Sequence, residues 1–172
     1  QKQARKQRED FIAVAAARAP TLLAEPHDWR TIERWLRETE FTWRGTSLGS
    51  VEPGAWKRLD ARLKATLAPL HDALSAARHE ARQERETLIA EAEALAAKAT
   101  DRDAVSRVKE VQARWQTHSK TIVLPQRDER ALWERFRVAC NTVFDARRGS
   151  RKEAEERMQG QRRTFEVLCE RL

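Results

Sequence analysis

The sequence predicts an all-α protein made of elongated tandem helical hairpins with coiled-coil-like packing, and three observations support this. Ala, Leu, Glu, Arg and Lys dominate the 172 residues, whereas only five Gly and five Pro are present and Tyr is absent. Such a composition is typical of long helices. Apolar residues recur at spacings of three and four, the period of an amphipathic helix. No period-two alternation typical of a strand is found.

The first segment, residues 1–27, is interpreted as the C-terminal helix of a preceding repeat followed by a linker. Its residues Arg8-Glu-Asp-Phe11 match Arg85-Glu-Thr-Leu88, which lie 77 residues later. A further step of 77 residues reaches Arg162-Arg-Thr-Phe165. Because the chain opens at Gln1 within a charged stretch, we expect it to be a fragment of a longer protein.

The rest of the chain divides into two repeat units, residues 28–99 (a degenerate copy) and 100–172. Four residues with the spacing i, i+4, i+7, i+11 occur in each unit: Ile32, Leu36, Thr39 and Trp43, then Ala104, Val108, Val111 and Trp115. Val51-Glu-Pro53 matches Val123-Leu-Pro125, and after one inserted residue Leu59–Leu63 matches Leu132–Phe136. Repetition of this kind indicates a helical array.

Each unit is predicted to begin with a short helix. The first should start after the N-cap Asp28 and end near Trp43, where glycines mark a loop. The second should start after Asp101 and run to about His118. Pro125 then ends a loop, and Asp128 is expected to cap the next helix.

The long helices are predicted over residues 54–99 and 128–172. The first has an apolar seam that is interrupted only around Glu84 and Arg85, and Pro69 should kink it because proline removes a backbone donor. In the second, residues 147–164 contain few apolar side chains, so we expect this section to project into solvent. At 1.5 Å per residue, each helix would span roughly 65 Å.

Enzyme signatures are absent from the sequence, so we expect no catalytic, cofactor-binding or metal-binding residues and no small-molecule substrate. The four His residues are scattered. Cys140 and Cys169 are too far apart on one helix for a disulfide, and apolar neighbours favour packing roles for both. No apolar run approaches the length of about 20 residues that a membrane span needs. We therefore expect a cytoplasmic protein without a membrane partner.

The tryptophans allow two interpretations. Trp43 and Trp115 hold equivalent places at the ends of the short helices, which favours pinning the short helix against the long one. Trp56 and Trp133 lie near the starts of the long helices among basic residues. Packing under the loop is favoured for this second pair, and stacking on unpaired bases is the alternative.

Basic residues provide the functional signal. The formal net charge is +7, which favours a polyanionic partner. Positive positions recur between the units, and a second group lies within residues 147–163. The candidate nucleic-acid-binding residues are Lys57, Lys64, Arg130, Arg137, Arg147, Arg148, Arg151 and Lys152. Guanidinium groups bind phosphate bidentately, although a solvated charged face is an equally simple reading.

The second unit resembles the bacterial DUF349 repeat family. The resemblance rests on Val111-Gln-Ala-Arg-Trp115, on Pro125, and on the segment from Leu132-Trp-Glu-Arg-Phe136 through Ala139-Cys-Asn141 to Phe144. The first unit keeps Trp43, Pro53, Leu59 and Arg62 but has Leu63 and His71 where the second has Phe136 and Phe144. The resemblance implies a cytoplasmic helical array of uncharacterised activity, with no catalytic residues to transfer.

The sequence therefore predicts a non-enzymatic nucleic-acid-binding module, associated with RNA or the ribosome, that binds phosphates through Arg-rich helix faces. No DNA-reading motif is visible. The alternative is a helical scaffold or spacer that mediates protein–protein interaction or self-association. A helix content above about 70%, twice the ordinary value, is expected.

Overall fold

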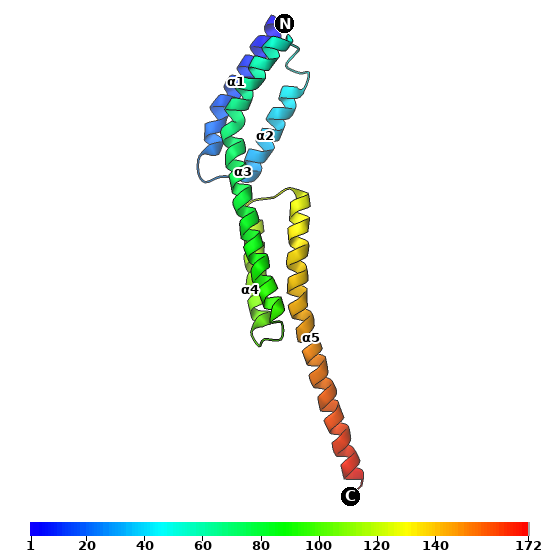
Figure 1. Cartoon of the computed structure of the whole chain (residues 1–172). Coiled ribbons are helices and arrows are strands. Elements are labelled where there is room, and N and C mark those ends of the chain that lie inside the picture. Colours follow the sequence, from blue (N-terminus) through cyan, green and yellow to red (C-terminus); the bar gives the residue numbers. More distant parts are fainter. Residues whose placement is uncertain (172) are drawn as a thin grey trace. The chain divides into compact units, whose positions relative to one another are not determined.

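The computed structural model describes residues 1–171, and five α-helices contain 84% of the chain (Figure 1). The helices are α1 (Lys2–Leu23), α2 (Trp29–Arg44), α3 (Pro53–Ala97), α4 (Ala104–Ser119) and α5 (Gln126–Glu170). Residues 1–171 contain no strand. The all-α prediction and the expected helix content are both confirmed.

The chain forms two compact units whose division falls inside α3. Unit 1 consists of residues 1–81 with 121–123, and unit 2 consists of residues 82–120 with the residues from 124 onward. Each unit therefore combines one preceding helix segment, one short helix and the start of the next long helix. The repeat boundaries predicted from the sequence, before residues 28 and 100, lie in loops between helices and differ from this division inside α3.

The short helices bury the two sets of residues whose spacing repeats in the sequence. Ile32, Leu36, Thr39 and Trp43 are buried on α2, and Ala104, Val108, Val111 and Trp115 are buried on α4. The N-cap of α2 is Asp28, as predicted, and its Oδ1 accepts a hydrogen bond from the Thr31 amide at 3.2 Å. The hydroxyl of Thr31 also donates to Asp28, and this bond is the main reason that the pKa of Asp28 is lowered.

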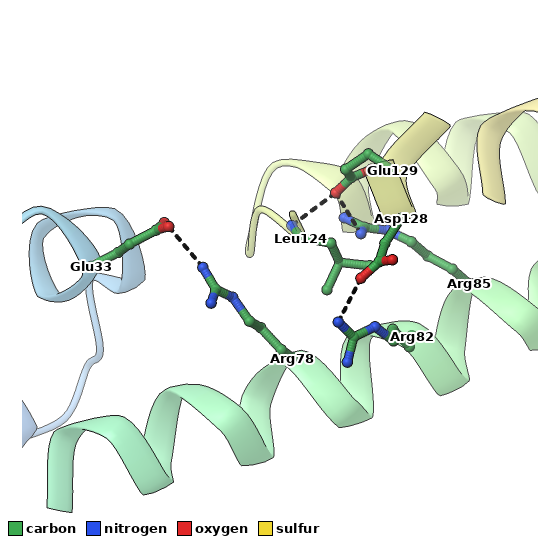
Figure 2. Close-up of polar contacts among 7 residues, drawn as sticks. All are labelled: Glu33, Arg78, Arg82, Arg85, Leu124, Asp128 and Glu129. Atoms are coloured by element: carbon green, nitrogen blue, oxygen red, sulfur yellow. Dashed lines mark hydrogen bonds and ion pairs between the residues drawn. The ribbon is translucent and has the colours of Figure 1, made fainter. Parts of the chain in front are cut away.

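Two predicted N-caps are wrong. Helix α4 begins after Asp103, because the chain forms a further turn in which the Ala104 amide donates to the Asp101 carbonyl at 3.2 Å. Helix α5 begins directly after Pro125, because the Pro125 carbonyl already accepts the first helical hydrogen bond, from the Glu129 amide at 3.0 Å. Asp128 consequently lies in the first turn, where its carboxylate accepts from Arg82 at 2.6 Å (Figure 2).

The long helices are continuous. Helix α3 continues through Pro69, and α5 continues through Gly149. The apolar seam of α3 is buried at Leu59, Leu63, Leu67, Leu70 and Leu74. Beyond these, Leu88 and Ile89 are also buried, with Arg85 between them and the first part of the seam.

Arg85 corrects the prediction that the seam breaks at Glu84 and Arg85, because its side chain is fully buried. Its Nη1 donates to Glu129 Oε1 on α5 at 2.6 Å (Figure 2). The same carboxylate oxygen accepts the Leu124 amide at 2.9 Å. One carboxylate therefore holds both the buried cation and the loop that leads into α5.

Arg8 is the counterpart of Arg85 in unit 1, 77 residues earlier, and it is 3% exposed. Its guanidinium donates to the carbonyls of Trp43 at 2.9 Å and Gly49 at 2.8 Å. It also lies 4.8 Å from the ring centroids of Trp43 and Trp56, a geometry that attracts a cation. In the alignment of the repeats, Trp56 corresponds to Glu129. For Arg8, the ring face of Trp56 and the carbonyls of Trp43 and Gly49 thus take the role that the Glu129 carboxylate has for Arg85.

Gly49 is required at its position for two reasons. Its φ is +81°, in the region that side chains disfavour. A Cβ on Gly49 would lie 2.8 Å from the Cβ of Ala4 on α1. The loop can therefore approach α1 closely enough to present its carbonyl to Arg8.

Replacing Glu129 with Gln should lower the free energy of unfolding by about 3–5 kcal/mol, because it leaves the buried Arg85 without its counter-charge. Denaturant unfolding followed by circular dichroism measures this. The matched control is Glu134→Gln, which removes an exposed partner of Arg137 and should cost less than about 1 kcal/mol. Equal losses in the two variants would contradict the role assigned to Glu129.

Acid should destabilise the fold through His118, in the last turn of α4. Burial is the main reason that the pKa of His118 is lowered, while Glu84 opposes the shift and Arg85 reinforces it. The unfolded chain therefore binds the proton more readily, and this part of the stability is lost as pH falls through about 6.5.

Unfolding measured between about pH 7.5 and about pH 5.5, either side of the ordinary histidine pKa, should show a smaller pH dependence in His118→Gln than in the native chain. The carboxylates Glu84 and Glu129, which also face His118, remain in both proteins and serve as an internal control. An unchanged slope in the variant would contradict the assignment.

Candidate nucleic-acid interface

The eight predicted cationic residues divide between the two units. Lys57 and Lys64 lie on α3 in unit 1, and the other six lie on α5 in unit 2. Lys57 is exposed, whereas Lys64 Nζ lies 2.9 Å from Asp60 Oδ2. The hydrogen bond from Lys64 is the main cause of the lowered pKa of Asp60, which also accepts from the Trp43 indole at 2.9 Å. Lys64 therefore also has a local structural role.

Four of the six cations on α5 form a stripe along one side of the helix. Arg130, Arg137 and Arg148 are seven and eleven residues apart, close to two and three turns at about 3.6 residues per turn. Lys152 follows one turn later, and all four are exposed. We call these residues the α5 stripe. It is a row of accessible positive charge on one helix.

Two members of the α5 stripe already have acidic neighbours. Arg137 Nη2 lies 2.7 Å from Glu134, and Arg148 pairs with Asp145. Both pairs join residues three apart on an exposed helix surface, and such pairs contribute about 0–1 kcal/mol. Exchanging either carboxylate for a phosphate would therefore cost little.

The remaining pair, Arg147 and Arg151, lies on a different side of α5 and lines a hollow in unit 2. Its other walls come from the turn that precedes α4 and the beginning of that helix. They include Arg102, which the sequence reasoning missed because it lies alone in a turn far upstream. The lining residues are Ala99, Thr100, Asp101, Arg102, Val105, Arg147, Ser150 and Arg151. We call this site the arginine hollow.

A comparison of the repeats explains the positive charge of the arginine hollow. At the offset of 73 residues that matches Asp72-Ala73 to Asp145-Ala146, Arg151 corresponds to Arg78 in unit 1, which lies 2.8 Å from Glu33 (Figure 2). The counterpart of Glu33 in unit 2 is Val105. Among residues 1–171, neither Arg147 nor Arg151 has a carboxylate within salt-bridge distance. The replacement of Glu33 by Val105 in the second repeat is the feature of the sequence that could have identified this site.

The tryptophans at the ends of the short helices are packing residues, as predicted. Trp43 is stacked on Trp56 with ring centroids 5.4 Å apart, and Trp115 on Phe136 at 4.3 Å. Trp56 is half-buried by this contact. Trp133 differs, because 46% of its surface is exposed. It lies one turn from both Arg130 and Arg137 of the α5 stripe, in the position of an accessible aromatic platform.

Residues 1–171 contain no group of three or more His, Cys, Asp or Glu side chains that could hold a metal ion. None of the helices in that range is both long and apolar enough to cross a membrane.

Comparison with known families gives one match. The model of the family described as Domain of Unknown Function (DUF349) matches residues 56–121 and 131–172, more than half of the chain. The chain belongs to the DUF349 family. No match was found among curated proteins or among solved structures.

The two DUF349 matches both begin near the start of a long helix. The first covers α3 from Trp56, then α4, and the second covers α5 from residue 131 onward. They contain Arg85 and every residue of the arginine hollow. The resemblance noted in the sequence is thus confirmed over these residues. In the first unit the match covers the long helix from residue 56 onward, whereas Trp43 and Pro53 lie outside it.

The C-terminal part of α5 is exposed along its whole described length. Every residue from 147 to 171 is exposed, which confirms the expectation for residues 147–164. Within residues 1–171 the packing role predicted for Cys169 is wrong, because its side chain is exposed, whereas Cys140 is buried. Leu172 lies outside the described residues.

The two thiols of this DUF349 chain should therefore react at different rates. Cys169 should react quickly with a thiol reagent in the native state, and Cys140 only on unfolding, because burial raises the pKa of its thiol and shields it. Stopped-flow titration with a chromogenic disulfide measures both. The Cys169→Ser variant should lose the fast phase alone, and two fast thiols would contradict the structure.

Proposed function

We propose that this DUF349 chain is a non-enzymatic RNA-binding module that contacts phosphate groups through α5. The observation that supports the proposal best is the arginine hollow, where Arg102, Arg147 and Arg151 face one concave site with a single carboxylate, Asp101. Guanidinium groups form paired, charge-assisted hydrogen bonds with phosphate oxygens. The excess of two positive charges over Asp101 leaves the site attractive to an anion.

The α5 stripe extends this positive surface along the helix. Arg130, Arg137, Arg148 and Lys152 offer exposed charges to successive phosphates of a backbone. Trp133 beside them supplies a ring on which an unpaired base can stack, worth about 1–3 kcal/mol. Stacking on bases favours single-stranded or looped RNA over duplex, so cytoplasmic transcripts and ribosomal RNA are the proposed targets.

Fluorescence anisotropy with labelled single-stranded RNA, duplex RNA and duplex DNA tests the proposal. We expect micromolar binding to single-stranded RNA that weakens steeply with salt. The variant Arg102→Gln/Arg147→Gln/Arg151→Gln should reduce the slope of log K against log[salt] by about 2, since each lost phosphate contact on a single strand removes about 0.7.

The matched control replaces three exposed cations of α1, Lys2, Lys6 and Arg18, with Gln. It changes the net charge by the same amount but leaves α5 intact, and its affinity should stay close to that of the native chain at about 150 mM salt, where long-range effects are screened. Equal losses in both variants, or no binding by the native chain, would refute phosphate recognition by the arginine hollow.

A second candidate function, a helical scaffold, is supported by the exposed apolar side chains on the last part of α5. Met158, Phe165 and Leu168 are 58%, 69% and 57% exposed. Large apolar side chains gathered on one exposed segment are typical of a protein-binding surface.

A further inference from the structure

One face of the exposed end of α5 has the residue pattern of a helix that is buried elsewhere in the chain. Met158, Arg162, Phe165 and Cys169 follow one another at spacings of four, three and four, so they lie on one side of the helix. All four are exposed. We call them the α5 terminal face. A shallow groove runs along it from Met158 to Glu166.

The counterparts of this face, 77 residues earlier, are fully covered. They are Ala81, Arg85, Leu88 and Ala92, and each is at most 2% exposed. A further step of 77 residues reaches Ala4, Arg8, Phe11 and Ala15 on α1. Arg8 and Ala15 are each 3% exposed. An arginine, a large apolar residue and a small residue therefore recur on three helix segments. The copy on α3 is fully covered, and in the copy on α1 the arginine and the small residue are buried while Phe11 is half-buried.

The same kind of element covers both buried copies. In unit 1, Arg8 donates to the carbonyl of Trp43 at the end of α2, and Phe11 stacks on the Trp43 ring at 5.9 Å. In unit 2, Arg85 donates to Glu129 at the start of α5. The acceptors come from the end of the short helix and its loop in unit 1, and from the first turn of the long helix in unit 2.

We propose that the α5 terminal face is the docking site for a further hairpin of the DUF349 repeat, built like α4 and the first part of α5. The hairpin offers Arg162 a carboxylate or loop carbonyls, as units 1 and 2 do for their arginines. Phe165 packs against the tryptophan at the end of its short helix. One position differs, because Glu166 replaces Ile12 and Ile89, so the hairpin has a polar or basic group at that point.

This docking site is separate from the proposed RNA-binding surface. The α5 stripe ends at Lys152, whereas the α5 terminal face begins at Met158, six residues or about 9 Å farther along the helix axis. Hairpin docking therefore leaves the α5 stripe accessible. Its test does not depend on whether the chain binds RNA.

The test extends the full chain so that the repeat continues in register. Because residue 172 corresponds to residue 95 at the offset of 77, a second copy of residues 96–146 is attached after Leu172. Its own cysteine is replaced by alanine, and Glu166 is replaced by Ile to match Ile89, which is buried in unit 2. Cys169 corresponds to Ala92, which is 0% exposed. The reaction rate of Cys169 with a thiol reagent should fall by about tenfold or more in the extended chain, because a covered thiol is shielded.

Two variants of the extended chain separate specific docking from general crowding. Arg162→Gln should restore the fast reaction of Cys169, because it leaves the hairpin's copy of Glu129 without the cation that pairs with it in unit 2. Arg157→Gln, an exposed arginine of the same segment that faces another direction, should leave Cys169 protected. Hydrogen exchange of residues 158–169 should follow the same order.

Two results would overturn the proposal. If Cys169 stays as reactive in the extended chain as in the native one, the hairpin does not dock. Misfolding of the attached segment is not the expected cause, because the same residues already form α4 and the first part of α5 in the native chain. If sedimentation velocity shows that the native chain self-associates and Arg162→Gln abolishes this, the face binds a second chain instead. Failure of RNA binding alone would bear on the arginine hollow and leave the docking proposal intact.

Discussion

A guanidinium group inside an apolar helix seam must find acceptors there, because an uncompensated buried charge costs several kcal/mol. In unit 2, Glu129 satisfies Arg85 and also holds the Leu124 amide, so the entry to α5 is tied to α3. In unit 1, the loop carbonyl of Gly49 does the same for Arg8. The buried arginine therefore fixes the position of the loop that packs over each helix. Because each short helix is joined to that loop, its position depends on the same contact.

Much of the fold follows from sequence periodicity. Ile32, Val108 and the other residues with the repeated spacing are buried because a period near 3.6 places them on one helix face. The helix starts were harder to predict from the sequence. Asp101 and Asp128 have good capping side chains, but the N-caps of α4 and α5 are Asp103 and Pro125. Arg85 was interpreted as an interruption of the apolar seam, because a charged residue can be predicted to be buried only if its ion-pair partner, here Glu129, is known. The cations of α5 were visible in the sequence, but their division between two sides and the addition of Arg102 depend on how α4 packs.

Divergence between the two repeats creates chemical differences on a shared backbone. Unit 1 pairs Arg78 with Glu33, whereas the corresponding Arg151 lies opposite Val105. One substitution of an acid by an apolar residue thus changes an internal ion pair into an accessible cation. Likewise, Trp56 and Glu129 occupy one position and solve the same electrostatic problem by different means. Similar packing in the two repeats of this chain therefore does not require similar surfaces.

The division of the compact units inside α3 has a consequence for synthesis on the ribosome. Chains emerge from the N-terminus, and their parts fold as units when all segments of a unit are available. The second part of α3 leaves the ribosome with its apolar residues and Arg85 uncovered, and α4 and the start of α5 must follow before Glu129 can reach it. Each long helix thus emerges before the hairpin that covers it. If translation pauses after residue 97 has emerged but before residue 129 has, that face of α3 stays uncovered.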